Sequence, residues 1–548
     1  MNWKILHKGL TKENQVLKIL LENRGLKTKK QIDDFLNPVS PEKLKAKDFG
    51  LKETELKKAV SRIKRAIEKK EKIVVYGDYD ADGICGTAIL WEALFKLKSL
   101  ASPFIPSRDE GYGLNGARLK ELANQDVRLI ISVDNGIVAS DEAKLAKKLG
   151  VDLIITDHHV PDLRRWPKEA LAIVHTTQTA GCGVAWFLAK QILKTFKIKD
   201  VSFGLDIVAI GLITDMVPLL GVSRSLVKYG IKVLRKTKRF GLLSLFDFAG
   251  LNKETIGVYE IGYLIGPRLN ASGRIEDPME SLRLVCTLDE NRAINLAQRI
   301  DQSNRERQEL TERLTLHARE AWLKEGQGEH LIFITHDSYQ EGLVGLIAGK
   351  LTEEFYLPSI VVCQKENISK ASARSIEEFN IVQAIKQCSD LLVAHGGHPK
   401  AAGLSVDNKN LEVFKKKILK IAKELLSGKD LKPTLKIDME IEPKLLTFKL
   451  LKEIEKMEPF GQGNPQPVFS SKGFMIKDAQ LLGSNSQHLK FKIELPGKKE
   501  LEAIGFRMGD FYSKLSIEKP IELAYNLSLN EWNGQSKLQL KLKDVKVK

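Results

Sequence analysis

Acidic side chains and two histidines follow three short apolar segments of the chain. Ile-Val-Val-Tyr at 73–76 runs into Asp-Tyr-Asp-Ala-Asp at 78–82, and two later apolar runs end in Val-Asp-Asn-Gly at 133–136 and Thr-Asp-His-His at 156–159. Runs of this length indicate buried strands, and their alternation with helical segments predicts a parallel sheet. Ligands of such sheets bind at the carboxyl ends of the strands. Clustered carboxylates repel one another unless a cation neutralises them, so the pattern predicts a site for Mg²⁺ or Mn²⁺.

A single Asp-x-Asp turn is more often a solvated acidic turn than a metal site. The repetition over three successive segments argues against that interpretation here, and adjacent histidines add a ligand type that suits Mn²⁺. Asp215 ends a further apolar segment, 206–215, that can be read as helix or strand. An acid in apolar surroundings is costly unless it is paired or bound to metal. Asp206, at the start of that segment, is more simply explained as a helix N-cap.

Composition places the chain among multidomain globular proteins. Its 548 residues are 43% hydrophobic, which predicts three or four domains. The first residues contain no apolar leader and no run approaches the length of a membrane span, so we expect a cytoplasmic protein without membrane contact. The five cysteines form no Cys-x-x-Cys pair and are expected to be reduced core residues. A net charge of +17 favours a polyanionic partner, although basic proteins without one are common.

Changes in composition and in hydrophobic periodicity divide the chain into five parts. We expect a mostly helical lead-in at 1–70, an α/β domain at 71–288, one or two long connecting helices at 289–328, a second α/β domain at 329–428 and a strand-rich domain at 432–548. Five or six short strands in the last part predict a small barrel of the OB type. Its aromatic residues are either core residues or platforms on which nucleic-acid bases stack: Phe491, Phe506, Tyr512 and Trp532.

The motifs together resemble those of the DHH phosphoesterase superfamily. Asp-Tyr-Asp-Ala-Asp-Gly at 78–83, the segments at 133–136 and 156–159, and the acid of Ile-Thr-Asp-Met-Val-Pro-Leu follow that family's order and spacing. Three later segments resemble the bacterial RecJ branch of the superfamily, which consists of single-strand-specific 5′→3′ exonucleases: IGPRLNASGR at 265–274, SARSIEEFNI at 372–381 and HGGHPKAAG at 395–403. The resemblance extends from about residue 5 to the C-terminus.

The resemblance implies a role for each matching position. The residues that match the family's metal ligands are Asp80, Asp82, Asp134, His158 and Asp215. His159 is placed to touch metal or the scissile phosphate, and Asp157 to orient a ligating imidazole through its other nitrogen. The residues that match groups holding DNA phosphates, or lying near the substrate, are Arg108, Arg268, Arg274, Ser372, Arg374 and His398.

The chemistry of these residues agrees with the implied roles, and two departures from the family pattern stand out. Arginine offers a planar fork to phosphate oxygens, and the Gly-Gly-His-Pro turn at 396–399 either admits a phosphate or simply caps a helix. The segment 173–186 is short and carries His175 where relatives often have a longer loop, and Ala371 stands where relatives often have glycine. These departures concern the geometry of loops and leave the implied ligand set unchanged.

The sequence thus predicts an α/β protein: a parallel-sheet DHH domain, a long helix, an α/β DHHA1 domain that binds substrate, and a C-terminal OB-like barrel that binds nucleic acid. The implied activity is 5′→3′ exonucleolytic hydrolysis of single-stranded DNA with two divalent cations, Mn²⁺ or Mg²⁺, in DNA repair and recombination. We expect a monomer whose partners are the 5′ end of single-stranded DNA, single-strand-binding protein and a helicase. The alternatives are a phosphodiesterase for short oligonucleotides or cyclic dinucleotides, and a non-catalytic replication scaffold.

Overall fold

The acidic segments all leave one parallel sheet. In the computed structural model its strand order is β3-β2-β4-β5-β6, and every pairing in it is parallel. The strands are β3 (Leu100–Phe104), β2 (Lys72–Tyr76), β4 (Val127–Val133), β5 (Asp152–Asp157) and β6 (Ala172–His175). The three strands that precede the acidic segments are therefore the three central ones, and the predicted parallel α/β architecture is confirmed.

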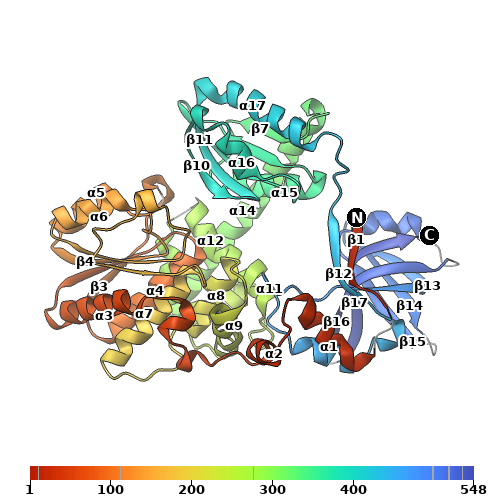
Figure 1. Cartoon of the computed structure of the whole chain (residues 1–548), viewed down its shortest axis with the longest axis horizontal. Helices are drawn as coiled ribbons and strands as arrows, with labels where there is room; N and C mark the ends of the chain where they lie inside the picture. Colours follow the sequence, from red (N-terminus) through yellow and green to blue (C-terminus); the bar gives the residue numbers. More distant parts are fainter. Residues whose placement is uncertain are drawn as a thin grey trace. The chain divides into compact units, whose positions relative to one another are not determined.

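Helices cover both faces of this sheet. Figure 1 shows α5 and α6 on one face and α3, α4 and α7 on the other. Their bounds are α3 (Glu53–Glu68), α4 (Ala81–Lys96), α5 (Gly116–Asn124), α6 (Ser140–Lys148) and α7 (Gly181–Thr195). With both faces covered, β2 and β4 are buried on each side, which explains why their sequences are continuous apolar runs instead of alternating ones.

After this sheet the chain is mostly helical up to residue 325. These helices are α8 (Leu205–Thr214), α9 (Gly221–Leu234), α10 (Phe240–Phe248), α11 (Val258–Glu260), α12 (Gly266–Ile275), α13 (Met279–Cys286) and α14 (Glu290–Glu325). The segment that ends at Asp215 is therefore a helix. Asp206 is not its N-cap, because Gly204 occupies that position. The carboxylate of Asp206 is buried and accepts hydrogen bonds from Thr237 Oγ1 and Arg239 Nε at 2.9 Å each.

The chain divides into two units, and each is described by itself. One comprises residues 1–270, 278–297 and 434–548, and the other comprises 271–277 and 298–433. The structure describes residues 1–9, 12–111, 113–275, 277–326, 328–495, 499–515, 519–532 and 535–547, with only the backbone described at 109, 274, 275, 499, 531 and 532. Among the described helices, none is both long and apolar enough to cross a membrane.

The second unit contains a mixed five-stranded sheet. Its order is β10-β11-β9-β8-β7, with β7 and β8 parallel and the other neighbours antiparallel. The strands are β7 (Ile332–His336), β8 (Ser359–Cys363), β9 (Ile368–Arg374), β10 (Leu392–His398) and β11 (Ala401–Asp407), and the helices are α15 (Val344–Phe355), α16 (Ile381–Lys386) and α17 (Asn408–Leu426). The predicted long connection is the single helix α14, which enters this unit.

The C-terminal strands close into a ring. The pairings β13–β14, β14–β15, β15–β17, β17–β16 and β16–β13 return to the starting strand, as expected for a five-stranded OB barrel. The bounds are β12 (Thr434–Glu440), α18 (Phe448–Glu455), β13 (Phe469–Leu482), β14 (His488–Leu495), β15 (Lys499–Gly505), β16 (Ile521–Trp532) and β17 (Gln535–Val547).

The N-terminal residues contain a strand that the sequence interpretation missed. Besides the helices α1 (Glu13–Asn23) and α2 (Lys29–Leu36), the first 70 residues form β1 (Asn2–His7). This strand pairs in parallel with β12, with Asn2 opposite Thr434 and His7 opposite Met439. A strand of six residues stabilised by a partner more than 400 positions away leaves no strong local signal.

Barrel closure decides which of the predicted stacking aromatics can reach a base. Phe491 is 1% exposed and belongs to the barrel core, so the core alternative holds for this residue. Phe506 and Tyr512 are 58% and 44% exposed and remain available for stacking. The side chain of Trp532 lies outside the described residues.

The five cysteines are free thiols, as predicted. Cys85, Cys182, Cys363 and Cys388 are buried, and Cys286 is half-buried. Burial raises the pKa of the Cys85 and Cys182 thiols well above the ordinary value, which keeps them protonated and unreactive.

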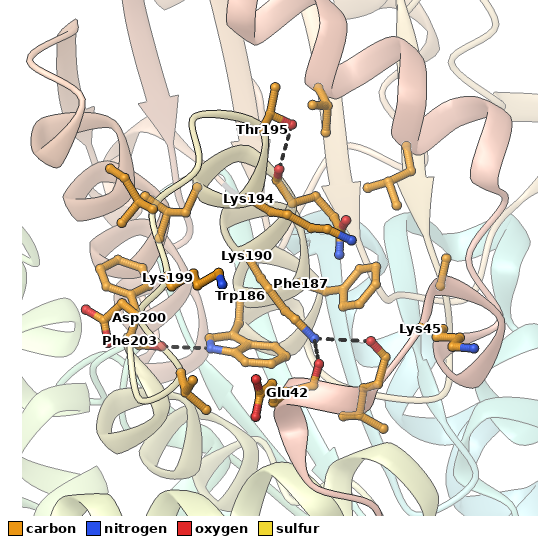
Figure 2. Close-up of a pocket in the computed structure, with 18 of the residues that line it drawn as sticks. Glu42, Lys45, Trp186, Phe187, Lys190, Lys194, Thr195, Lys199, Asp200 and Phe203 are labelled. Carbon is orange, nitrogen blue, oxygen red and sulfur yellow. Dashed lines mark hydrogen bonds between the residues drawn. The ribbon is translucent and has the colours of Figure 1, made fainter.

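Lys190 of α7 attaches the N-terminal turns to the sheet domain. Its ammonium donates to the carbonyl oxygens of Pro41 and Glu42, at 2.8 Å each, and of Leu44, at 3.1 Å. Figure 2 shows this lysine above the ring of Trp186, whose indole nitrogen donates to Phe203 O at 2.8 Å. The surrounding cavity has a volume of about 1290 Å³.

Arg224 of α9 joins three segments that are distant in the sequence. Its Nε donates to Phe35 O at 2.6 Å, its Nη2 to Met457 O and Glu458 O at 2.8 Å each, and its Nη1 to Pro459 O at 3.2 Å. The guanidinium also lies over the Phe35 ring, with 3.8 Å between its carbon and the ring centroid. The residue is 1% exposed. It therefore satisfies four carbonyl oxygens where the barrel junction meets the helices.

We expect Arg224→Met to lower the free energy of unfolding by roughly 3 to 5 kcal/mol, because it leaves buried carbonyl oxygens without donors. Urea unfolding followed by circular dichroism measures the change. Lys236→Met, at an exposed position just after the same helix, is the control and should stay within about 0.5 kcal/mol of the parent. Equal stabilities of the two variants would contradict the assigned role of Arg224.

Candidate metal centre

The three central strands deliver their acidic groups to one edge of the sheet. Asp78, Asp80 and Asp82 follow β2, Asp134 follows β4, and the 157–159 segment ends β5. The last turn of α8 adds Asp215 as its C-cap residue. Potential ligand atoms within 4.8 Å of one another occur in three overlapping groups: Asp134 with His158 and His159; Asp82 with His158 and Asp215; and Asp78 with Asp80 and Asp134. All five predicted metal ligands therefore lie in one cluster.

His158 links two of these groups. Its Nε2 lies 3.1 Å from Asp134 Oδ1 and 3.6 Å from Asp215 Oδ2. Burial lowers the pKa of His158, so the neutral imidazole is favoured. Neutral imidazole is the form that donates an electron pair to a metal ion.

Helix α7 fixes the orientation of Asp82. The amide of Gly181, in the first turn of α7, donates to Asp82 Oδ2 at 2.7 Å, and that of Cys182 donates to Oδ1 at 3.1 Å. The helix N-terminus thus stabilises this buried carboxylate. Only glycine fits at position 181, because a Cβ atom there would lie 2.6 Å from the Asp134 Cβ.

Backbone geometry sets the positions of Asp80 and Asp134. Asp80 is the N-cap of α4 and accepts hydrogen bonds from the amides of Asp82 and Gly83 at 2.9 and 3.0 Å. Asp134 has φ +64°, a left-handed conformation that is strained for a residue other than glycine. Such strain persists where the surroundings impose it, which is frequent at functional sites.

Asp157 orients the second histidine, not the first. Its Oδ1 lies 2.8 Å from His159 Nδ1 and also accepts the amides of His158 and His159, while Oδ2 accepts the amide of Ile137 at 2.8 Å. The Nε2 of His175 donates to His159 O at 2.8 Å. These contacts place the Nδ1 proton of His159 toward Asp157 and leave its Nε2 as the nitrogen that can face a ligand.

Burial and neighbouring charges oppose the ionisation of Asp134 and Asp215. Burial and the charges of Asp82 and Asp80 raise the pKa of Asp134 well above its usual range, and they raise that of Asp215 to about 9. Burial opposes protonation of His159, but the hydrogen bond to Asp157 prevails and raises its pKa to about 9. Burial likewise opposes ionisation of Asp157, yet the bonds from His159 and the backbone amides lower its pKa. Divalent cations would relieve this repulsion.

Stability without metal should therefore fall as the pH rises. The folded pKa values of Asp215 and His159, about 9 each, exceed their unfolded values, so the folded state binds more protons. In chelator, the melting temperature should decrease from about pH 4 to about pH 9. Added Mn²⁺ should raise it more at pH 8 than at pH 6, because the ligands must lose protons to bind the ion.

Thermal unfolding in chelator and in Mn²⁺ across this range tests the expectation. Asp215→Asn is the informative variant, since it removes one of the titrating ligands and should flatten the pH dependence. An Mn²⁺-induced shift that is the same at pH 6 and pH 8 would contradict a carboxylate-rich metal site.

Asp78 is a candidate ligand that the sequence interpretation left out of its metal set. It is 2% exposed, and burial and the charge of Asp80 raise its pKa well above the usual range. Its Oδ1 has no hydrogen-bond partner among the described residues. A buried carboxylate oxygen without a donor fits a missing cation. The only sequence signal was its place as the first acid after β2, which does not distinguish it from Asp80.

Asn270 is a second residue that the sequence interpretation did not single out. Its Oδ1 accepts the amide of Ala81 at 2.8 Å, directly between the two ligand candidates Asp80 and Asp82. This contact connects α12 to the first turn of α4. The asparagine lies within the motif at 265–274, but nothing in its residue type identified the partner.

Three of the predicted phosphate-binding arginines precede α14, and the structure describes the side chains of two of them. Arg108 lies over the ring of Tyr79, with 4.3 Å between the guanidinium carbon and the ring centroid, and its charge acts on Asp78. Arg268 of α12 donates from Nη1 to Leu264 O at 2.8 Å. The side chain of Arg274 lies outside the described residues.

The remaining predicted substrate residues lie together in the second unit. Ser372 and Arg374 are two residues apart on β9 and share one face of the sheet. A Cβ atom at Gly345, in the first turn of α15, would lie 3.2 Å from Arg374 Nη2 and 3.4 Å from Ser372 Oγ. His398 is exposed and aligned with Arg374 through Ala401 of β11. A hydroxyl, a guanidinium and a helix N-terminus are thus gathered at one place, which suits a phosphate.

The fold and the site match the DHH class of proteins. Residues 72–212 match the profile of the DHH family, N-terminal domain, and residues 328–427 match the DHHA1 domain. Residues 437–544 match a third profile, the RecJ OB domain.

Whole-chain comparisons identify the family within this class. Single-stranded-DNA-specific exonuclease RecJ of Haemophilus influenzae is 30% identical, over 95% of this chain and 94% of the relative, and that of Thermus thermophilus is 31% identical, over 90% and 71%. The Bacillus subtilis enzyme of the same name is 36% identical over 90% of this chain, which spans 63% of that relative. The crystal structure of T. thermophilus RecJ with Mn²⁺ superposes with a TM-score of 0.83 at 28% identity, covering 100% of this chain and 80% of that one. The chain belongs to the RecJ family.

Proposed function

We propose that this chain is an exonuclease that removes nucleotides from the 5′ end of single-stranded DNA, with two Mn²⁺ or Mg²⁺ ions, in DNA repair and recombination. The observation that carries the proposal is the convergence of carboxylate and imidazole ligands from β2, β4, β5 and α8 in overlapping groups within 4.8 Å. Family membership supports the substrate, since the relatives are named for single-stranded DNA. Solved RecJ structures with Mn²⁺ and with Mg²⁺ support the choice of ions.

The donor set fits paired hard cations. Ionised carboxylates and neutral imidazole are the ligands that Mn²⁺ accepts, and the residues that would hold the ions are Asp78, Asp80, Asp82, Asp134, His158 and Asp215. Bound ions would supply an activated water and stabilise the attacking and leaving oxygens. We assign the residues 71–288 to the catalytic domain that carries these ligands.

In the proposed mechanism, His159 contacts the scissile phosphate. Its Nδ1 is held by Asp157 at 2.8 Å, and its raised pKa of about 9 favours the imidazolium form at neutral pH in the absence of metal. The opposite nitrogen can donate to a non-bridging oxygen of the scissile phosphate. Asp157 therefore acts as a positioning residue that sets the tautomer and direction of the ring.

Phosphate recognition is assigned to two basic groups. Arg108 and Arg268 of the first unit, and Arg274 of the second, would contact backbone phosphates. In the second unit, whose DHHA1 domain we place at 329–428, Ser372 and Arg374 would bind the terminal 5′ phosphate with His398 nearby. The barrel at 432–548 would bind the strand further along, and proteins that coat or unwind DNA would be the partners of the monomer.

Time-resolved digestion of a labelled single strand tests the function. With Mn²⁺, a 5′-phosphorylated 30-mer should release mononucleotides from its 5′ end, the matching duplex should resist, and chelator should stop the reaction. Activity confined to dinucleotides would instead identify a small-molecule phosphodiesterase. DNA binding without any metal-dependent cleavage would identify a scaffold.

A further inference from the structure

Two exposed tyrosines stack on each other on the helical segment that leads into α12. Tyr259 and Tyr263 are 64% and 68% exposed. Their ring centroids lie 4.9 Å apart with 30° between the ring planes. Single exposed apolar side chains are ordinary. A pair of large rings that face solvent together forms an exposed aromatic patch, and such patches often mark binding sites. None of the roles assigned above uses it.

Local geometry explains how both rings stay on the surface. Tyr259 lies in α11, and Tyr263 lies in a single π-helical turn, Ile261–Ile265. Ile261 and Ile265 are fully buried, so the same turn packs one face inward and presents both tyrosines outward. Isolated π turns within helices are rare and frequently occur at functional sites.

The same segment packs against residues that are adjacent in sequence to the candidate metal ligands. Gly266 follows the π turn, and a Cβ atom there would lie 2.2 Å from Thr214 Cγ2, next to the ligand candidate Asp215. Four residues later, Asn270 binds the amide of Ala81 within the acidic motif. Tyr263 and Tyr259 are three and seven residues before Gly266, so they lie about 5 and about 10 Å from it along the helix. Those distances correspond to one or two nucleotides of an extended strand.

We propose that Tyr259 and Tyr263 form a stacking platform for unpaired bases of the DNA strand next to the scissile phosphate. This inference rests on the proposed nuclease function and adds a specificity element to it. Aromatic rings stack on bases of any sequence, which suits an exonuclease that must accept every nucleotide. Bases in a duplex are stacked and paired with one another, so the platform favours single strands. Arg268, five residues after Tyr263, supplies a cation for the neighbouring phosphate.

Replacing both rings tests the platform. Tyr259→Ala combined with Tyr263→Ala should raise KM for a 5′-phosphorylated 20-mer by roughly 10- to 100-fold. The change in kcat should be small, because neither residue touches the metal ligands. The matched control, Tyr259→Phe with Tyr263→Phe, retains the rings and should stay within about twofold of the parent. Because both side chains are exposed, the melting temperature should not change, which excludes misfolding as the cause.

Abasic substrates separate base stacking from contacts with the sugar-phosphate backbone. A 20-mer without bases at the second to fourth nucleotides should be a poor substrate for the parent protein and an equally poor one for the alanine variant. A 5′-phosphorylated dinucleotide offers at most one base to the platform, so the alanine variant should lose less activity on it than on the intact 20-mer. If the alanine variant digests the intact 20-mer like the parent, or loses activity equally on all three substrates, the platform does not exist.

A binding measurement without metal distinguishes failure of the platform from failure of the proposed nuclease function. In chelator, fluorescence anisotropy should show roughly 10- to 100-fold weaker binding of the 20-mer to the alanine variant, and no loss for the phenylalanine variant. If the parent cleaves nothing, the proposed function fails while this binding difference still supports the platform. Equal binding of the 20-mer to all three proteins overturns the platform whatever the cleavage result.

Discussion

Replacing Asp134 with alanine should lower the rate of DNA hydrolysis by about 10³-fold or more. Asp134 belongs to two of the three ligand groups and lies 3.1 Å from His158 Nε2, so its loss removes a candidate ligand from both of those groups. Bound divalent ions supply several kcal/mol of transition-state stabilisation, and about 4 kcal/mol corresponds to 10³ in rate. His158→Ala should have a similar effect, because it also belongs to two groups.

Substrate affinity and fold provide the controls for this prediction. Binding of a single-stranded 20-mer in chelator should remain within about threefold of the parent, since basic groups elsewhere hold the phosphates. Asp141→Asn, at an exposed aspartate of α6 that pairs with Lys144, should leave the rate unchanged. A variant at Asp134 that still cleaves at nearly the parental rate would refute the site.

Arg374→Ala should remove the preference for a 5′ phosphate. Its guanidinium and Ser372 Oγ both lie close to Gly345 at the start of α15, an arrangement suited to a terminal phosphate. A hydrogen bond to a charged group contributes about 1.5 to 3 kcal/mol, which corresponds to roughly a 10- to 150-fold loss of kcat/KM on the phosphorylated strand. The strand with a 5′ hydroxyl should be affected by less than about threefold.

Two further variants sharpen this result. Arg374→Lys keeps the charge but not the planar fork, so its preference should be intermediate. Arg319→Ala, at an exposed arginine of α14 that pairs with Glu354, should behave like the parent. An unchanged ratio of kcat/KM between phosphorylated and hydroxyl strands in Arg374→Ala would rule out the assigned role.

The local sequence pattern was sufficient to predict the architecture of the domain that carries the candidate metal ligands. Each central strand is a short apolar run, and an acidic group follows directly where the strand ends, so chain order alone places the acids at one sheet edge. The five predicted ligands are indeed together. The stacked tyrosines were not predicted, because exposure of an aromatic ring depends on the π turn and its packing.

The sequence analysis was wrong about Asp206 and missed β1 because the residues with which they interact are distant in the sequence. Asp206 is paired with Arg239 instead of capping a helix, and β1 pairs with β12 across most of the chain. For Phe491 the sequence left a core position and a stacking platform open, and closure of the barrel decided for the core.

The sequence by itself determined the fold class and the acids that follow the central strands, because strand and helix periodicity and the spacing of acids after strands are local properties. The resemblance of its motifs to the DHH superfamily implied the order of the domains and the candidate metal ligands. Only the tertiary structure decided that Asp78 is buried with no hydrogen-bond donor for its Oδ1 in the described part of the chain, that Asp157 holds His159, and that Asn270 reaches the acidic motif. These contacts join segments through side-chain direction and burial. The direction and the burial of a side chain are set only when the strands and helices have packed.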